Sequence, residues 1–457
     1  MSYRSTSYWF DSIGIEPEPR APLPGDRDVD IVILGAGFSG LWTAYYLSIA
    51  DPSCQIAVIE RDIAGFGASG RNGGWCWPDV QGMATYHEED PEGAGRLRKA
   101  IVATVYEVGE VCEREGIAAD YKRVGGIGIA LDQLQATHAQ EELAEARAFG
   151  FSEDDHYWLE PDELRKRIRV ATAVGGTFQK HVAAVNPAKL ARGLADAVER
   201  RGVKIYEQTA VTGVEPGRVQ TSHGTVRASR IVMAMNAYKV KLSSYKRDVI
   251  PVYENMCATE PFSNEVWDEI GLVPRGLFAD RRRLFTYAQR TADNRIAIGG
   301  RTPRFHYGSG IDPSLDHSAR TQRELANALR SMFPQLGDFK ITHRWGGPIA
   351  VARDMATRIF VDPKTGIGGV GCFMGEGVAA SNLAGRTLCD ILLERQSELT
   401  SLPWVGKTSP RWEPEPLRWL GVNLGIALNR VADSYEDRTH RSAGLLDQMM
   451  DRLGVDM

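Results

Sequence analysis

The hydrophobic and polar positions of the chain first predict a strand, a helix and a second strand. Residues 29–34 form an apolar and mostly β-branched run, which is typical of a strand buried in a parallel sheet. From residue 41 to residue 49 the apolar positions recur at helical spacing, and Asp51 and Pro52 end that pattern. The run at residues 55–59 predicts the next strand. This order is typical of an α/β protein with a parallel sheet.

The rest of the chain alternates predicted helices with short strands. Helices are expected over residues 91–118, 133–147, 187–202, 318–332 and 384–392. Strands are expected at residues 124–131 and 230–236, and residues 250–310 alternate strand-like segments with turns, which indicates an antiparallel sheet. The Pro-rich start of the chain predicts an irregular strap, and beyond residue 400 a Pro- and Trp-rich linker precedes a short apolar helix.

A glycine motif joins the first strand to the first helix. Residues 35–40 read GAGFSG, in which the glycines allow a tight turn and a close approach of backbone to a pyrophosphate. The following helix offers unpaired N–H groups to phosphates, and Glu60 ends the next strand where an acid accepts hydrogen bonds from ribose hydroxyls. The same pattern recurs at residues 65–70 and 366–371, without strand, helix and acid together. We therefore predict a dinucleotide site at the first motif; the alternative is an ordinary glycine-rich turn.

Composition and charge limit the class of protein. A chain of 457 residues with 43% hydrophobic and 25% charged residues has the composition of a globular protein with two domains or one elaborated domain. The net charge of −5 gives no electrostatic case for nucleic acid, and the arginine run at residues 281–283 is interpreted as a solvated turn. No apolar run predicts a transmembrane segment, and no secretory signal is seen.

Cysteine and histidine usage gives no indication of a metal site. The six cysteines are scattered without a CxxC pair, which favours a reducing, cytoplasmic setting over a disulfide framework or a zinc site. Four histidines considered as ligands or bases share no suitable spacing and are interpreted as surface or core residues: His181, His223, His306 and His343.

Several motifs together carry a resemblance to a known family. They are the glycine motif, GASGRNGG at 67–74, IVMAMNAY at 231–238, RIAIGGR at 295–301, RWGGPI at 344–349 and GCFMGEGVAASNLAGRTL at 371–388. Over nearly its whole length the chain resembles the D-amino-acid-oxidase-like family of FAD-dependent oxidoreductases. The likeness is closer to the amine-oxidising, gamma-glutamylputrescine oxidase-like branch of that family.

The resemblance implies an α/β fold with a Rossmann-like FAD-binding domain and an inserted α+β, antiparallel-sheet substrate domain, the glutathione-reductase-type FAD/NAD(P)-binding fold. The FAD-binding domain is expected to comprise residues 28–90, 180–245 and 340–400. The substrate domain is expected to comprise residues 91–179 and 246–339. Residues 1–27 are expected to form an N-terminal strap and residues 401–457 a C-terminal extension.

The resemblance also implies which residues hold FAD. The pyrophosphate would lie against Gly35, Gly37, Phe38, Ser39 and Gly40, and the adenosine side against Glu60, Arg61 and Val211. The ribityl chain and the ring would follow Gly67, Ala68, Ser69, Arg71, Asn72, Gly73 and Gly74, with Ala234 and Asn236 as a third contact segment. The pyrimidine edge would face Gly375, Glu376, Gly377 and Val378, where a helix N-terminus can stabilise negative charge on reduced flavin. For Glu376 the alternative is a solvent-exposed loop acid.

Two departures from the family pattern qualify the resemblance. Some relatives attach FAD covalently through a Cys near the RWGG motif or a His after the second strand; here residues 345–353 contain no Cys and residues 61–75 no His. We therefore expect non-covalent FAD, with Cys76 as the alternative attachment point. Sarcosine-oxidase-like relatives place a Lys after the C-terminal glycine loop, and residues 378–380 offer no such cation, which weakens an α-amino-acid or sarcosine assignment.

The implied reaction is oxidation of the C–N bond of a small amine or amino-acid-like substrate. Hydride would pass to flavin N5, water would hydrolyse the imine, and O2 would reoxidise the flavin to give H2O2. The alternatives are an amine dehydrogenase that passes electrons to a quinone or carrier protein, a flavin monooxygenase, and a non-enzymatic flavin-binding protein. Besides the amine and O2, the expected partner is a second copy of the chain, bound through the C-terminal helix.

Three residues of the inserted sheet are candidates for the substrate face. Tyr253 and Arg301 lie on strands that line the pocket roof in the family, and Trp345 precedes the Gly-Gly turn near the ring. Each has a structural alternative, because a strand Tyr or a Trp is often core and Arg301 would also suit an interdomain salt bridge. No metal is expected.

Overall fold

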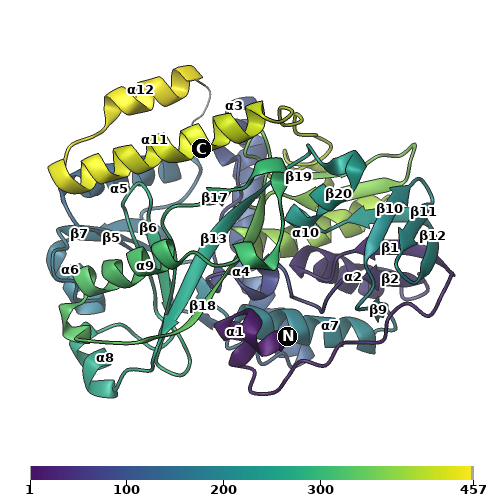
Figure 1. Cartoon of the computed structure of the whole chain (residues 1–457), viewed down its shortest axis with the longest axis horizontal. Helices are drawn as coiled ribbons and strands as arrows, with labels where there is room; N and C mark the ends of the chain where they lie inside the picture. The colour runs from purple at the N-terminus through teal and green to yellow at the C-terminus, as the bar shows by residue number, and fades with distance from the viewer. Residues whose placement is uncertain (1, 454–457) are drawn as a thin grey trace.

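Two large sheets lie side by side, each with helices packed against it (Figure 1). The computed structural model describes residues 2–453. The first sheet is built around the predicted strand–helix–strand unit, with β1 (Arg27–Leu34) paired in parallel to β2 (Ile56–Ile59) on one side and to β12 (Gly224–Met233) on the other. Its remaining strands are β9 (Lys204–Tyr206), β10 (Val211–Glu215), β11 (Arg218–Thr221), β19 (Arg358–Val361) and β20 (Ile367–Gly371).

Four helices share one apolar core with the first sheet: α2 (Phe38–Ala50), α4 (Pro91–Glu115), α7 (Pro187–Arg200) and α10 (Gly377–Leu392). The start of α4 is set by Asp90, whose carboxylate accepts from the N–H of Gly93, and by Pro91 at the first helical position. The helix ends three residues earlier than predicted because Gly116 takes a left-handed conformation, with φ +67°.

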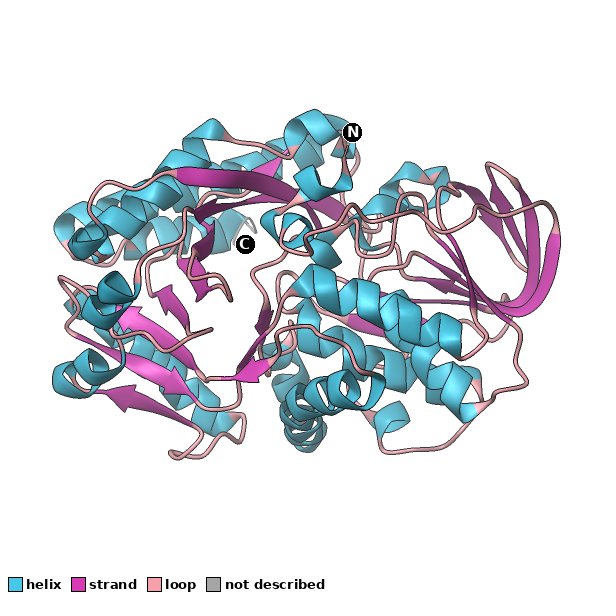
Figure 2. Cartoon of the chain, turned by 90° about the horizontal axis from the view of Figure 1, so that it is seen from below, coloured by secondary structure: helices cyan, strands magenta, loops and turns pink. Residues whose placement is uncertain are grey.

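The second sheet has nine strands, and Figure 2 shows it on the other side of the molecule from the first. Its strands are β5 (Gly126–Ala130), β6 (His156–Leu159), β7 (Gly175–Gln179), β13 (Ile250–Thr259), β14 (Leu277–Asp280), β15 (Thr286–Arg290), β16 (Ile296–Gly300), β17 (Arg304–Phe305) and β18 (Ile341–Val351). All of its pairings are antiparallel except that between β5 and β14. The helices against it are α5 (Gln133–Ala148), α6 (Pro161–Arg167), α8 (Asn264–Ile270) and α9 (Ala319–Met332).

The fold class expected from the resemblance is confirmed, whereas the domain boundaries stay predictions. One strand lies beyond a predicted boundary: β18 pairs along its whole length with β13 of the second sheet, although residues 340–400 were expected in the FAD-binding domain. A small third sheet joins β3 (Trp75–Cys76), β4 (Lys122–Arg123) and β8 (Ala183–Ala184).

Short helices fill the remaining connections. Two are α-helical, α1 (Tyr8–Asp11) and α3 (Met83–Glu89). The 3-10 turns are η1 (Tyr3–Thr6), η2 (Ala68–Gly70), η3 (Asn236–Lys241), η4 (Ser243–Tyr245), η5 (Tyr307–Ser309), η6 (Pro313–Leu315), η7 (Pro334–Leu336) and η8 (Leu399–Ser401). The predicted N-terminal strap is anchored by α1, where Tyr8, Trp9 and Phe10 are buried in a cluster with Trp345 of β18.

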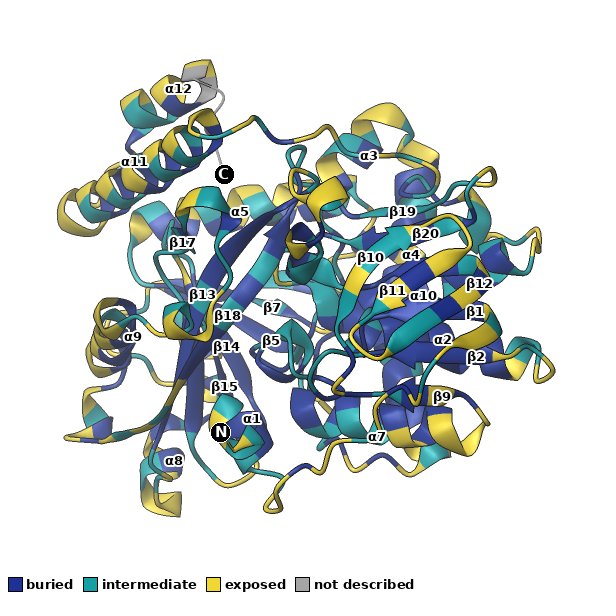
Figure 3. Ribbon diagram, turned by 45° about the vertical axis from the view of Figure 1, so that its right-hand side comes forward, coloured by how far each residue is buried: buried dark blue, intermediate teal, exposed yellow. Residues whose placement is uncertain are grey.

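The C-terminal extension ends in two helices, α11 (Leu417–Thr439) and α12 (Gly444–Leu453). One side of α11 buries Val422 and Ile426 against β13 and β17. Its opposite side is exposed (Figure 3) and carries Leu417, Leu420, Leu424, Val431 and Tyr435, which are 43–61% accessible. Within residues 2–453, no helix is long and apolar enough to cross a membrane.

Candidate cofactor and substrate site

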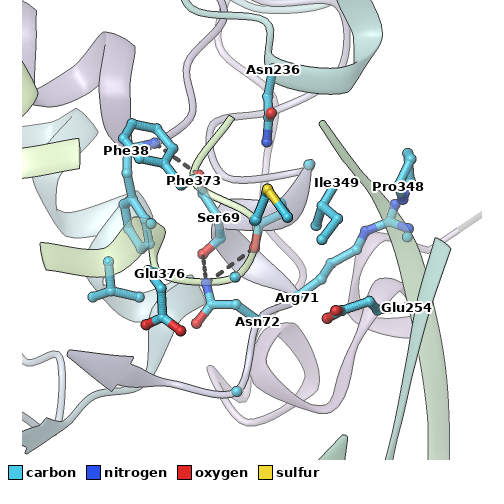
Figure 4. A pocket seen from close by; sticks show the side chains of 18 of the residues that line it. Phe38, Ser69, Arg71, Asn72, Asn236, Glu254, Pro348, Ile349, Phe373 and Glu376 are labelled. Atoms are coloured by element: carbon cyan, nitrogen blue, oxygen red, sulfur yellow. Dashed lines mark hydrogen bonds between the residues drawn. The ribbon is translucent and has the colours of Figure 1, made fainter. Parts of the chain in front are cut away.

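One cavity of about 680 Å³ is lined both by loops of the first sheet and by strands of the second. This volume is in the range of about 300–1,000 Å³ that is usual for ligand and cofactor sites. All predicted cofactor residues except Gly40 and Gly74 line it, and those two stand directly behind the lining. The structure thus brings together segments that are more than 300 residues apart in the sequence (Figure 4).

The glycine turn can be formed only by glycine at its ends. Gly35 has φ +106°, and a Cβ there would lie 2.7 Å from the carbonyl oxygen of Ala234. A Cβ on Gly40 would lie 2.0 Å from the carbonyl oxygen of Gly35, so the first turn of α2 can pack this closely on β1 only without a side chain. The N–H of Phe38 at the start of α2 donates to Ser69 Oγ at a distance of 2.8 Å. This bond holds the loop at residues 67–74 against the N-terminus of the helix. This is the backbone cradle that a dinucleotide pyrophosphate requires.

Glu60, the acid expected to bind the ribose, lines the cavity next to the glycine turn. Glu60 is half-buried and accepts hydrogen bonds of 2.9 Å from the backbone N–H groups of Ala36 and Asp62. Burial raises the pKa of Glu60 to about 7. Beside it, the guanidinium of Arg61 lies 5.0 Å from the ring of Tyr238 and pairs with Asp62. Both carboxylates can accept from hydroxyl groups of a bound nucleoside.

The loop at residues 67–74 is held rigidly by its own hydrogen bonds. Asn72 Nδ2 donates to the carbonyl oxygens of Ala68 and Ser69, both at 3.1 Å, while its Oδ1 accepts from the N–H of Gly74 at 2.8 Å. The side chain of Arg71 is fixed in the cavity wall, because its guanidinium pairs with Asp316 at 2.6 Å and donates to the carbonyl oxygen of Gly346 at 2.8 Å. The tip of the loop faces Tyr287, so a Cβ on Gly73 would lie 2.6 Å from that ring.

The second glycine loop precedes α10, and Glu376 is its N-cap residue. Glu376 is half-buried in the cavity wall, not a fully solvated loop acid. Burial, with smaller contributions from the charges of Asp79 and Glu254, raises its pKa to about 8. Figure 4 shows its carboxylate on the opposite side of Asn72 from Glu254.

None of the three substrate-face candidates lines the cavity. Tyr253 is fully buried, its hydroxyl accepts from the N–H of Asp312 at 3.2 Å, and burial raises its pKa to about 12. Arg301 binds Asp433 of α11 at 2.9 Å, as its structural alternative suggested. Trp345 donates its indole N–H to the carbonyl oxygen of Arg71 at 2.7 Å. The structure therefore gives no support for placing these residues at the substrate.

Sequence reasoning missed two polar residues, Glu254 and Tyr287, that line the cavity from this sheet. Successive residues of a strand point to opposite faces, so the neighbour of Tyr253, Glu254, faces the cavity. Tyr287 of β15 donates its hydroxyl to Glu254 at 3.2 Å, and burial raises the pKa of both groups. A period-two pattern along residues 250–259 could have indicated two faces, but nothing in the sequence says which one faces a cavity.

The arginine run is not a solvated turn, which corrects our interpretation of residues 281–283. Each of these arginines lines the outer end of the cavity. Each also pairs with a carboxylate on a helix: Arg281 with Glu142 of α5, Arg282 with Asp437 of α11 and Arg283 with Glu436 of α11. The run was misread because its partners on α11 lie about 150 residues further along the chain.

The glycine turn, Glu60 and the two glycine-rich loops thus line one cavity. The sequence matches the DAO family, described as FAD dependent oxidoreductase, over residues 30–391, and the chain belongs to this family. FAD as cofactor and an enzymatic role in oxidation and reduction, both expected from the resemblance, are thereby confirmed.

Known relatives agree with this assignment. The chain is 28% identical over 442 residues to the probable oxidoreductase OrdL of Haemophilus influenzae, covering 94% of this chain and 97% of the relative. It is 29% identical over 422 residues to gamma-glutamylputrescine oxidoreductase of Escherichia coli, covering 88% of this chain and 93% of the relative. Glycine oxidase from Geobacillus kaustophilus shares the fold, with a TM-score of 0.68 at 20% identity, covering 81% of this chain and 96% of that one.

Proposed function

We propose that the protein oxidises the C–N bond of a small amine or amino-acid-like substrate. The observation that carries this proposal is the cavity itself, in which the FAD cradle continues into a wall formed by Glu254, Tyr287 and Glu376. Hydrogen-bond acceptors in a partly buried wall suit a substrate nitrogen. The E. coli relative is named for an amine substrate, which supports the same class.

Bound FAD supplies a two-electron acceptor that takes a hydride from the carbon attached to nitrogen, and water then hydrolyses the resulting imine. The residues of this chain would position the reactants: Asn72 fixes the loop at residues 67–74 that would hold the ring, and Glu254 and Glu376 line the cavity where they would face the substrate nitrogen. An alkylamine has a pKa near ~10.4, so it arrives protonated. A carboxylate whose pKa is raised, such as Glu376 at about 8, is suited to accept the proton that must leave.

We propose O2 as the electron acceptor, with H2O2 as the second product. An oxygen electrode tests this, because stoichiometric oxygen uptake and peroxide release on adding an amine are expected. Turnover only with a quinone or carrier protein would favour the amine dehydrogenase instead. Bleaching by NADPH without any amine would favour a monooxygenase. No reduction of the flavin by any amine or amino acid would contradict the proposed function.

Attachment of FAD without a covalent bond is part of the same proposal. No cysteine lines the cavity among residues 2–453. The alternative attachment point, Cys76, is fully buried, and burial raises the pKa of its thiol, so the reactive thiolate is disfavoured. We expect acid precipitation to release all of the yellow cofactor into the supernatant. The six cysteines are free thiols, which supports a reducing, cytoplasmic setting as a further part of the proposal.

We also propose a homodimer formed through α11. Its exposed apolar residues stand three, four, seven and four positions apart, at Leu417, Leu420, Leu424, Val431 and Tyr435, so they lie along one side of the helix. Such a seam is complementary to itself when two copies meet about a two-fold axis. The buried side of α11 carries the carboxylates that bind the arginine run, so the helix is held in place for this contact.

A further inference from the structure

In the part of the chain that the structure describes, the arginines that line the cavity are all paired with carboxylates, whereas two of the lining carboxylates are not paired with a cation. Every arginine that lines it, among the residues described, is already paired with a carboxylate: Arg61 with Asp62, Arg71 with Asp316, Arg281 with Glu142, Arg282 with Asp437 and Arg283 with Glu436. Lys241 also lines the cavity, but it lies at the adenosine end beside Arg61 and Asp62. No arginine near the 72–74 loop is therefore free to bind an anionic substrate group.

Two of the described carboxylates that line the cavity have no cationic partner. Within residues 2–453, Glu254 and Glu376 form no ion pair with any Lys, Arg or His. Asp79, which also lines the cavity, pairs with Arg98 at 3.1 Å, and Glu60 at the other end is bound by two backbone amides. A partly buried carboxylate without a cation is unfavourable, and a cationic ligand would relieve this.

Aromatic rings provide an independent reason to expect a cation in the same place. Trp75 and Trp77 form a tilted pair with ring centroids 5.8 Å apart, and Phe285 and Tyr287 form a second pair at 6.1 Å. All four residues line the cavity. The faces of such rings attract alkylammonium groups, and their apolar surface suits the attached carbon chain.

We propose that Glu254, supported by the hydroxyl of Tyr287, and Glu376 bind the ammonium group of the substrate, so that the site selects alkylamines over amines with a carboxylate on the reacting carbon. The inference rests on the proposed function and narrows it to a substrate class. A carboxylate on the reacting carbon would be forced towards Glu254 and Glu376, and it would find no free arginine to compensate.

The first test measures binding without turnover, on the holoenzyme at pH 9, where Glu376, with a pKa of about 8, is ionised and an alkylamine with a pKa near ~10.4 is still protonated. tert-Butylammonium has no hydrogen on the carbon attached to nitrogen, so it cannot be oxidised, and pivalate has the same shape with the opposite charge. Calorimetry and the shift of the flavin absorption band should show binding of tert-butylammonium and at least tenfold weaker binding of pivalate. Pivalate binding as tightly as tert-butylammonium would overturn the proposal, whatever the enzyme oxidises.

The second test uses Glu254→Gln and Glu376→Gln, which keep the shape of each side chain and remove its charge. Each should raise the Kd of tert-butylammonium about tenfold or more. The control is Glu269→Gln, an exposed carboxylate of α8 whose loss should leave Kd unchanged. Flavin content and Tm show whether each variant is folded and loaded. Two loaded variants that bind tert-butylammonium as tightly as the parent enzyme would contradict the proposal.

The third test separates failure of this inference from failure of the proposed function. Butylamine and norvaline differ only by a carboxylate on the reacting carbon. Anaerobic reduction of the flavin should be faster with butylamine at equal concentration. Faster reduction by norvaline would overturn the inference and leave C–N oxidation standing. Reduction by neither, nor by any other amine or amino acid, would refute the proposed function, while the binding tests would still decide whether the pocket prefers a cation.

Discussion

Trp345 of β18 donates its indole N–H to the carbonyl oxygen of Arg71, 2.7 Å away in the cofactor loop. This bond joins the second sheet to the loop at residues 67–74, which we propose holds the flavin. The contact supports a role for Trp345 in positioning that loop.

We expect Trp345→Phe to weaken FAD binding about fivefold, because a lost hydrogen bond of this kind is worth roughly 1 kcal/mol. The measurement is a flavin titration of the apoprotein. The matched control is Trp267→Phe on α8, which removes another buried indole hydrogen bond, to the carbonyl oxygen of Asn294, away from the loop. Equal effects of the two substitutions on FAD affinity would contradict this role.

Gly35→Ala should abolish stable FAD loading. The new Cβ would lie 2.7 Å from the carbonyl oxygen of Ala234 in a backbone conformation with φ +106°, at a strain of roughly 1–3 kcal/mol. Flavin absorbance per protein after purification is the measurement. Gly95→Ala in α4 is the control, since a Cβ there meets nothing within 4 Å and alanine favours a helix. Full loading of Gly35→Ala would show that the turn tolerates a side chain.

The stability of the protein should depend on pH through Glu376. Its pKa rises from 4.5 to about 8 in the folded state, so the folded protein favours the protonated acid. The resulting stability is fully present below pH 4.5 and is lost as pH rises through about 8. Glu376→Gln should therefore raise Tm relative to the parent protein more at pH 9 than at pH 5, measured by scanning fluorimetry without amines. An equal difference at both pH values would contradict this.

Asp433→Asn should destabilise the fold by roughly 1–3 kcal/mol, measured by urea unfolding. Asp433 is buried and accepts from Arg301 and from the backbone N–H of Leu284, both at 2.9 Å, so its charge holds the loop at the outer end of the cavity. Asp437→Asn is the control, because this carboxylate is half-exposed and its pairings with Arg282 at 3.5 Å and with Arg301 at 3.9 Å are each worth under about 1 kcal/mol. A smaller loss of unfolding free energy for Asp433→Asn than for Asp437→Asn would contradict the role of Asp433 in holding this loop.

Leu424→Glu should convert the proposed dimer to a monomer, because it places a charge in the middle of the apolar seam of α11. Light scattering after size-exclusion chromatography measures the mass. Arg438→Glu, at an exposed position near the end of the same helix, is the control and should leave the mass unchanged. A parent protein that is already monomeric at micromolar concentration would refute the dimer.

Local sequence patterns could predict those parts of the candidate site whose residues lie close together in the sequence. The turn at residues 35–40 and Glu60 follow from glycine conformation and strand–helix–strand spacing, which a reader of the sequence can see. The substrate wall could not be found in this way. Whether Tyr253 or Glu254 faces the cavity depends on which side of β13 the first sheet lies, and that is decided by packing between distant segments. The position of the arginine run at the cavity depends on ion pairs with residues of α11, and no local sequence pattern reveals these partners.

The indole of Trp9 also holds the cofactor loop, because it donates to the carbonyl oxygen of Asn72 at 2.7 Å. The same tryptophan packs edge-on against Trp345, with ring centroids 6.4 Å apart, and Asp11 binds His343. These contacts tie residues 8–11 both to the loop at residues 67–74 and to strand β18. We expect a variant without residues 2–12 to purify with less flavin per protein than the parent chain, which absorbance after purification would reveal.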